Sequence, residues 1–212
     1  MHILKFTTGH LWNALLLCVL PVILLYFSIA APVFAQPTNK EDNDIRITLT
    51  EPDKRGGKAY RMIYVVDVPM EIYWKFKTDF DNDFLVKNKY IEKHRFIGWK
   101  NGRAITENEY TIGPDCASRW ATRVFPNLYR LEFELINPDE CRQEFHYGSI
   151  ELKSLGRQTK IIQKAYFDFF GATFWVFYPF SGGMKSFFRY TARWEQKIVV
   201  KLKSRYISDS GP

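Results

Sequence analysis

Three residues near the end of the predicted β-structure have side chains that could bind or transform a ligand. Lys164, Tyr166 and Asp168 alternate along the chain, so in a β-strand they lie on one face of the sheet. If this face points inward, the lysine and the aspartate are buried charges that must pair, and they could orient a ligand. If it points outward, they are solvated, and Phe167 and Phe169 belong to the core. The pattern leaves both registers open.

A pair of carboxylates is the second candidate for chemistry. Glu107 and Glu109 also alternate within a predicted strand, and two carboxyl groups on one face can serve as general acid and general base. The alternative is a solvated face of a β-hairpin, which the surrounding charged sequence favours.

Several kinds of site have no signature in the sequence. His94 and His146 are too far apart for a metal motif, and the chain contains no CxxC, HExxH, GxSxG, P-loop or dinucleotide fingerprint. The net charge of +7 comes from 30 basic and 23 acidic residues spread along the chain, without the concentrated basic run typical of nucleic-acid binding. We therefore expect no metal, no cofactor and no nucleic-acid partner, and a mild preference for anionic partners.

Aromatic residues are the third group of candidates, because they make up 17% of the chain. A buried Tyr or Trp needs a partner for its polar tip, and a pocket with a few polar groups on apolar walls provides one. The alternative for each ring is an ordinary place in the core. The rings that could line a pocket are Trp120, Phe133, Tyr147, Tyr166, Phe187, Tyr190 and Trp194.

The elements that would position these residues follow from hydrophobic periodicity and turn signals. A strand over 59–68 is followed by two short helices over 70–80 and 83–90. Six consecutive antiparallel strands then cover 91–99, 103–112, 117–124, 128–136, 142–152 and 159–170. The order predicts an α+β protein in which a curved antiparallel sheet of about seven strands wraps a long C-terminal helix.

The final helix, over residues 183–206, has two distinct faces. Apolar residues recur at steps of three and four and would cover the sheet. A second row repeats a positive charge every four residues, which needs compensation because like charges at this spacing repel. We expect either contact with anionic lipids, aided by the aromatic stretch 174–180, or a solvated face with ion pairs. The row is Lys185, Arg189, Arg193, Lys197, Lys201 and Arg205.

This order of elements resembles the helix-grip fold of the START-like superfamily, also called SRPBCC or polyketide cyclase/dehydrase-like, which includes Bet v 1-like proteins. The matching stretches are VVDVPMEIYWKFKTDF near the front and MKSFFRYTARWEQKIVVKL near the end, and the resemblance spans residues 59–206. The motifs are loose, and the superfamily has no invariant catalytic signature. The resemblance implies a hydrophobic ligand held between sheet and helix.

Three functions remain open at this point. The first is binding or carriage of a hydrophobic small molecule or lipid, such as a quinone or polyketide-like compound. The second is an enzyme of the cyclase or hydrolase type that uses Lys164, Tyr166, Asp168 or Glu109 in the same pocket. The third is a membrane-surface interaction module with a filled core. A cavity of several hundred Å³ would separate the first two from the third.

The first 57 residues are predicted to lie outside the domain. Residues 1–35 have a weakly basic start, an apolar run over 11–31 and the small-residue ending VFA, which predicts a signal peptide, with an uncleaved anchor as the alternative. Residues 36–57 are polar and predict a linker containing a short strand at 45–49. The domain covers 58–207, and 208–212 form a tail. The leader predicts a periplasmic or secreted protein.

Cys116 and Cys141 remain after the leader, and two cysteines in an oxidising compartment are a disulfide candidate. Each follows a turn and begins a predicted strand, with one other strand between them. Strand starts separated in this way lie about 10 Å apart, whereas a disulfide requires Cα atoms within about 7 Å. The disulfide therefore depends on the two turns curling inward.

Overall fold

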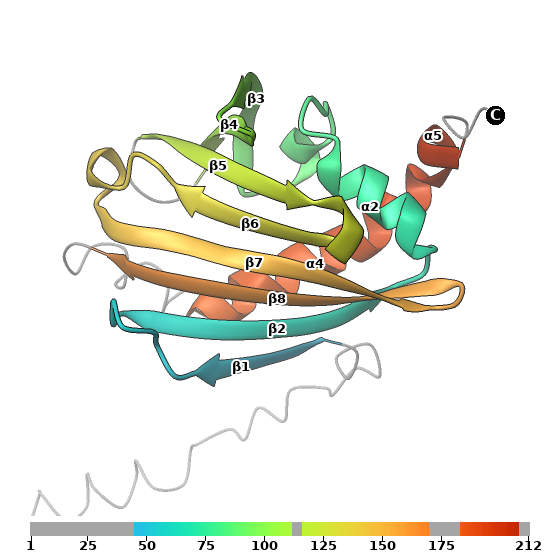
Figure 1. The fold of residues 1–212 in the computed structure, drawn as a ribbon, viewed down its shortest axis with the longest axis horizontal. Coiled ribbons are helices and arrows are strands. Elements are labelled where there is room, and N and C mark those ends of the chain that lie inside the picture. Colours follow the sequence, from blue (N-terminus) through green and yellow to red (C-terminus); the bar gives the residue numbers. More distant parts are fainter. Residues whose placement is uncertain (1–44, 112–115, 170–182, 208–212) are drawn as a thin grey trace, which may run out of the picture. The chain divides into compact units, whose positions relative to one another are not determined.

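The protein is described by a computed structural model that covers residues 45–111, 116–169 and 183–207. Eight strands form one antiparallel sheet in the order β1-β2-β8-β7-β6-β5-β4-β3 (Figure 1). The strands are β1 (Arg46–Thr50), β2 (Lys58–Val66), β3 (Ile91–Lys100), β4 (Arg103–Tyr110), β5 (Ala117–Phe125), β6 (Arg130–Leu135), β7 (Gln143–Leu155) and β8 (Gln158–Phe169). The helices are α2 (Met70–Thr78), α4 (Gly183–Lys201) and α5 (Lys203–Ile207), and the short 3-10 turns are η2 (Leu85–Lys87), η3 (Pro126–Leu128) and η4 (Asp139–Cys141).

The predicted helix-grip architecture is confirmed, with three differences in detail. The sheet has one strand more than expected, because β1 pairs along its whole length with β2 and lies within the predicted linker. The second short helix, expected over 83–90, is reduced to the single turn η2. The final helix is interrupted at Leu202 and continues as α5.

The inner face of the sheet packs against α4, which crosses behind the central strands (Figure 1). On β8 the buried residues are Ile161, Ala165 and Phe167, and the alternation of a strand places them on one face. The helix contributes Phe188 and Val199, which lie on its apolar stripe. Burial of this apolar surface holds helix and sheet together, because each buried CH₂ group contributes about 0.8 kcal/mol.

The predicted disulfide between Cys116 and Cys141 is present, with Cα atoms 5.5 Å apart. The separation is shorter than strand spacing suggests because β6 ends at Leu135, which pairs with Trp120. Beyond that pair the intervening strand has ended, and Cys141 lies in η4 rather than in β7. The bridge therefore closes one rim of the sheet.

Several predicted segments lie outside the described residues. These are the leader (1–35), the aromatic stretch 174–180 and the tail (208–212). Within the described ranges, the helices are too short or too polar to cross a lipid bilayer.

Candidate functional site

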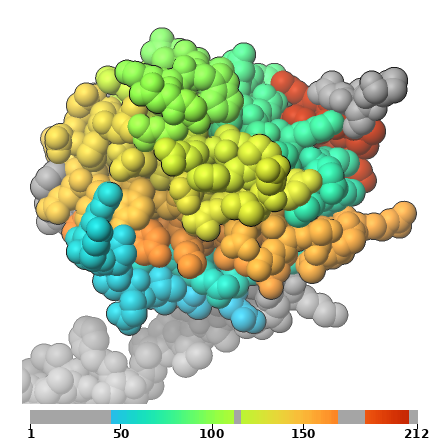
Figure 2. All heavy atoms as spheres, in the orientation of Figure 1, coloured from blue at the N-terminus to red at the C-terminus, as the bar shows by residue number. Residues whose placement is uncertain are grey.

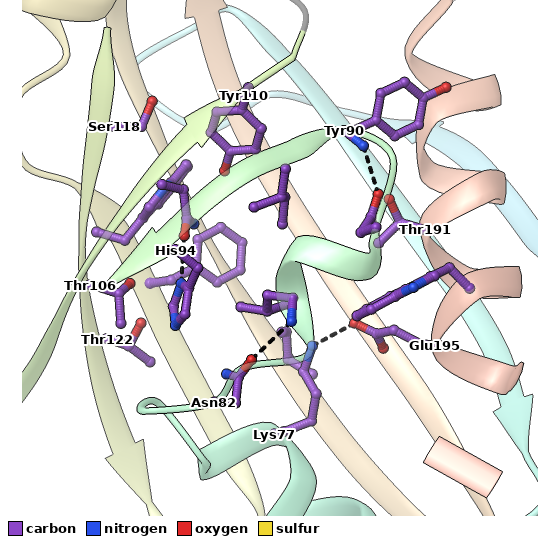
Figure 3. Close-up of a pocket in the computed structure, with 18 of the residues that line it drawn as sticks. Lys77, Asn82, Tyr90, His94, Thr106, Tyr110, Ser118, Thr122, Thr191 and Glu195 are labelled. Atoms are coloured by element: carbon purple, nitrogen blue, oxygen red, sulfur yellow. Dashed lines mark hydrogen bonds and ion pairs between the residues drawn. The ribbon is translucent and has the colours of Figure 1, made fainter. Parts of the chain in front are cut away.

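A cavity of about 340 Å³ lies between the inner face of the sheet and α4. One wall is mainly apolar and is built from α2, the turn after it and α4. Figure 3 shows side chains from these elements facing the sheet across the cavity. The principal apolar residues of this wall are Phe76, Phe84, Leu85, Met184, Phe187 and Trp194.

The opposite wall is the sheet itself, and it carries a group of polar side chains. Thr106, Asn108 and Tyr110 alternate along β4 and therefore share its inner face. Ser118 and Thr122 face the cavity from β5 (Figure 3). Hydroxyl and amide groups of this kind can both donate and accept hydrogen bonds. The wall can therefore bind the polar groups of an otherwise apolar molecule.

His146 lies on the polar wall in a desolvated position. Burial lowers its pKa to about 3, so the ring is neutral at physiological pH. Its Nδ1 lies 3.2 Å from the Oε1 of Gln143. The neutral ring has one donor nitrogen and one acceptor nitrogen. The ring packs edge-on against Trp120, with centroids 4.8 Å apart. His146 is therefore a neutral hydrogen-bonding group in the cavity wall.

A buried carboxylate, Glu195, lies in the lining of the cavity and accepts hydrogen bonds from three neighbouring side chains. Its Oε1 accepts from Lys77 Nζ at 2.7 Å, and its Oε2 accepts from the hydroxyl groups of Tyr64 and Tyr73. Burial alone would raise the pKa of Glu195, but the Lys77 charge and the hydrogen bonds outweigh it and keep the pKa low. The ionised carboxylate thus connects α4 to α2 and β2, and its ion pair with Lys77 borders the cavity (Figure 3).

The same network shifts the pKa values of the two tyrosines. Burial, reinforced by the negative charge of Glu195, raises the pKa values of Tyr64 and Tyr73 well above the usual 10. Both therefore stay protonated and act as donors. On the polar wall, burial also raises the pKa of Tyr110.

Four of the predicted aromatic residues line the cavity. Trp120 and Phe133 belong to the sheet wall, and Phe187 and Trp194 belong to the α4 wall. Tyr190 is not one of the lining residues, but its ring packs against the lining residue Tyr90 with centroids 4.9 Å apart. The helical spacing of Phe187 and Trp194 therefore placed both residues on the side of α4 that faces the sheet.

The other four predicted ligand residues lie outside the lining of this cavity, and three of them, Tyr147, Lys164 and Tyr166, line a second hollow on the outer face. Phe167 is fully buried on the inner face, so alternation along β8 places Lys164, Tyr166 and Asp168 on the outer face. Tyr147 lies there too, stacked on Tyr166 with ring centroids 5.2 Å apart. Its hydroxyl donates to Asp53, and burial and this bond raise the pKa of Tyr147. The burial of Phe167 decided the register.

The carboxylate pair also belongs to the outer face. Glu107 accepts from Arg95 at 2.6 Å, and Glu109 accepts from Lys93 at 2.8 Å, across the β3–β4 pairing. These are cross-strand ion pairs at the surface, which confirms the alternative of a solvated hairpin face. On the final helix, Arg205 forms ion pairs with Asp79 and Asp83, so part of its basic row is compensated by ion pairs.

The sequence analysis missed the polar wall of the site as well as Glu195 and His146, and of these last two only Glu195 left a signal. Glu195 lies on the apolar stripe of α4, three residues after Ala192 and four before Val199. A carboxylate in such a stripe must find partners and so marks a buried polar network. His146 had no comparable signal, because the rings of Phe145 and Tyr147 on either side suggested the opposite face.

The described residues hold no group of three or more His, Cys, Asp or Glu side chains placed to bind a metal ion. The polar groups of the cavity are instead suited to hydrogen bonding with an organic molecule.

No described protein family and no curated protein sequence matches the chain. Several solved structures do match it. A START superfamily protein from Mycobacterium smegmatis has a TM-score of 0.54 at 14% identity, with 68% of this chain and 98% of that chain covered. Norcoclaurine synthase from Thalictrum flavum has a TM-score of 0.52 at 11% identity, with 75% and 98% covered.

A protein from Thermus thermophilus has a TM-score of 0.52 at 12% identity, with 72% of this chain and 99% of that chain covered. The chain has the START-like helix-grip fold. At these identities the likeness concerns the fold alone. The cavity of this START-like domain must therefore be interpreted from its own residues.

Proposed function

We propose that the protein binds and carries an uncharged hydrophobic small molecule, such as a lipid, a quinone or a polyketide-like compound, outside the cytoplasm. The observation that carries this proposal is the cavity of about 340 Å³ with one apolar and one polar wall. A volume of this size is within the usual range for small-molecule sites. It argues against the third function, a surface module with a filled core.

The lining indicates the chemistry of the ligand. The apolar wall of α2 and α4 would cover a hydrocarbon or aromatic body. The hydroxyl and amide groups of β4 and β5 would bind its oxygen or nitrogen atoms. The charges of Lys77 and Glu195 neutralise each other, Asp79 pairs with Arg205, and His146 is neutral, so these groups provide no free charge for an ion. Norcoclaurine synthase, with the same fold, was solved in complex with dopamine and hydroxybenzaldehyde, which supports a small organic ligand.

Two features support a location outside the cytoplasm. The apolar leader predicts export, and the Cys116–Cys141 disulfide fits an oxidising compartment. Whether the leader is removed or retained as an anchor does not change this part of the proposal.

An enzyme of the cyclase or hydrolase type is the alternative, and one observation favours it. Lys77 and Glu195 border the cavity as a pair of proton-transfer groups 2.7 Å apart. The residues first considered for this role, Lys164, Tyr166, Asp168 and Glu109, lie outside the cavity lining. Carriage is the better-supported function because Glu195 is fully engaged with three partners.

Native mass spectrometry of protein purified from its own compartment tests the proposal. We expect a bound molecule to be released on denaturation. Thr122→Phe, or Thr106→Phe if the first variant does not fold, would fill the cavity and abolish this species. Lys164→Ala, on the outer face, is the matched control and should keep it. A folded cavity-filled variant that retains the molecule would overturn the proposal.

A further inference from the structure

The cavity lining continues through Phe80 into a group of apolar side chains on β3 that lie outside the lining. We name Phe80, Phe96, Ile97 and Trp99 the β3 lip. The Phe80 ring packs against Phe96 and Trp99, with centroids 6.3 Å and 5.8 Å away. Trp99 is 61% exposed and Ile97 is 50% exposed. The lip is therefore an exposed aromatic and aliphatic surface of the kind that marks interaction sites.

The lip is continuous with the cavity. Phe80 itself lines the cavity, and so does His94, two residues before Phe96 on β3. The Nε2–H of His94 donates to the carbonyl oxygen of Phe80 at 2.9 Å, which fixes the loop after α2 against β3. Figure 2 shows the β3–β4 hairpin as a lobe at the upper edge of the domain. A partner that covers the lip would thus lie next to the part of the cavity lined by Phe80 and His94.

The charge around the lip favours an anionic partner. Residues 79–100, which span the lip, contain five Lys or Arg, three Asp and one Glu. Two of the aspartates, Asp79 and Asp83, pair with Arg205. Lys93 and Arg95 pair with glutamates of β4. Lys87, Lys89 and Lys100 form no ion pair within the described part of the chain. Exposed tryptophan with flanking lysines is typical of surfaces that enter the headgroup region of a bilayer.

The shape of the strand disfavours a second copy of the chain as the partner. β3 is the edge of the sheet, and an edge can add a strand from another molecule. Its pairing with β4 is interrupted by register shifts between Ile91 and Lys93 and between Phe96 and Gly98. Gly98 has a φ of +135°. Such bulges bend an edge strand and prevent regular edge-to-edge pairing.

We propose that the β3 lip docks the domain onto a bilayer that contains anionic lipids, with Trp99 and Ile97 inserted at the headgroup level. The proposal rests on the proposed function and extends it, since docking there brings the part of the cavity lined by Phe80 and His94 close to the source or destination of a hydrophobic ligand. It uses a different surface from the basic row of α4.

Vesicle co-sedimentation of the full chain tests the docking. The vesicles are phosphatidylcholine alone, or phosphatidylcholine with about 30% phosphatidylglycerol to supply negative charge. The lip variant is Ile97→Ser with Trp99→Ser. The control is Leu128→Ser with Leu155→Ser, which removes side chains that are 64% and 51% exposed elsewhere on the domain. Any contribution of residues 1–44 is common to all proteins compared.

We expect the lip variant to bind anionic vesicles at least about tenfold more weakly than the control variant, and added salt to weaken the control's binding. Equal binding by the two variants would overturn the proposal, as would binding indifferent to phosphatidylglycerol. A concentration-dependent dimer that only the lip variant loses would assign the lip to a second copy instead.

Native mass spectrometry separates this result from the proposed function. A lip variant that keeps its bound molecule but loses vesicle binding supports both proposals. A protein that docks through the lip but never contains a molecule would refute carriage and leave docking intact.

Discussion

Both faces of β7 carry polar residues, but the two faces use them in opposite ways. On the outer face, Tyr147 lies with Glu132 and Glu134 of β6 among surface ion pairs such as Arg130–Glu132. On the inner face, His146 is enclosed by aromatic rings and fixed by a single glutamine. The residue types alone therefore do not identify the site. What distinguishes the functional face is desolvation.

The energies of the two faces should differ accordingly. Exposed ion pairs contribute about 0–1 kcal/mol, because water and salt screen them. Removing one partner of a buried pair costs about 3–5 kcal/mol, because the other charge stays buried and unpaired. Replacing one buried carboxylate and one exposed carboxylate with alanine therefore tests the comparison.

The largest effect is expected at Glu195. Glu195→Ala would leave the Lys77 ammonium and two buried tyrosine hydroxyls without their acceptor. We expect a loss of about 3–5 kcal/mol in the free energy of unfolding, measured by urea denaturation. Glu109→Ala removes an exposed pair with Lys93 and should cost less than about 1 kcal/mol. Similar losses in the two variants would contradict the distinction between the faces.

Gly148 tests how tightly the inner face is built. A Cβ at this position would lie 2.1 Å from the carbonyl oxygen of Lys164 and 2.5 Å from the Phe133 ring. Because the first contact is with backbone, Gly148→Ala should strain the β7–β8 pairing and cost about 1–3 kcal/mol. Ser149→Ala, the next residue on the outer face, should be nearly neutral. Thermal unfolding of both variants measures the difference, and an unchanged melting temperature for Gly148→Ala would show that the sheet adapts.

The fold could be predicted from the sequence because its signals are local and repeated. Alternation marked β3 to β8, and the three-four spacing of Phe187, Phe188 and Trp194 marked α4. The strand β1 was given only as a short segment of a linker. Its five residues have a weak pattern of their own, and their place depends on pairing with β2.

The candidate site was harder to predict because it depends on which face of each strand is buried. In β8 both alternating sets contain large apolar residues, so the pattern did not show whether Phe167 or Tyr166 lies on the inner face. The contact of Phe167 with Tyr60 and Phe188 decides the register, and this contact joins three segments distant in sequence. No local pattern contains it. The inward position of His146 could not be predicted for the same reason, because His146 pairs with Phe167 across β7 and β8.

The buried histidine predicts a pH dependence that the outer face does not share. The pKa of His146 is about 3 in the folded protein, against 6.5 in the unfolded chain. Between these values the unfolded chain binds a proton that the folded protein does not, so stability falls as the pH falls. The slope is at most about 1.4 kcal/mol per pH unit.

His146→Phe keeps a packed ring but removes this titration. Urea denaturation at pH 7 and pH 5 should show that the wild-type protein loses roughly 1–2 kcal/mol more than the variant over this interval. If both proteins lose the same amount, the ring of His146 is accessible to protons in the folded state, and the cavity wall is wetter than its packing indicates.

The smallest effect is expected for Lys164→Ala, at the position that the sequence first suggested for the site. Its side chain is exposed on the outer face, so its loss should change stability by less than about 0.5 kcal/mol. Bound ligand, measured by native mass spectrometry, should be unchanged. A loss of ligand without a loss of stability would mean that the outer face takes part in binding. The division of the sheet into a functional and a solvated face would then be wrong, since a residue opposite the cavity would control what the cavity holds.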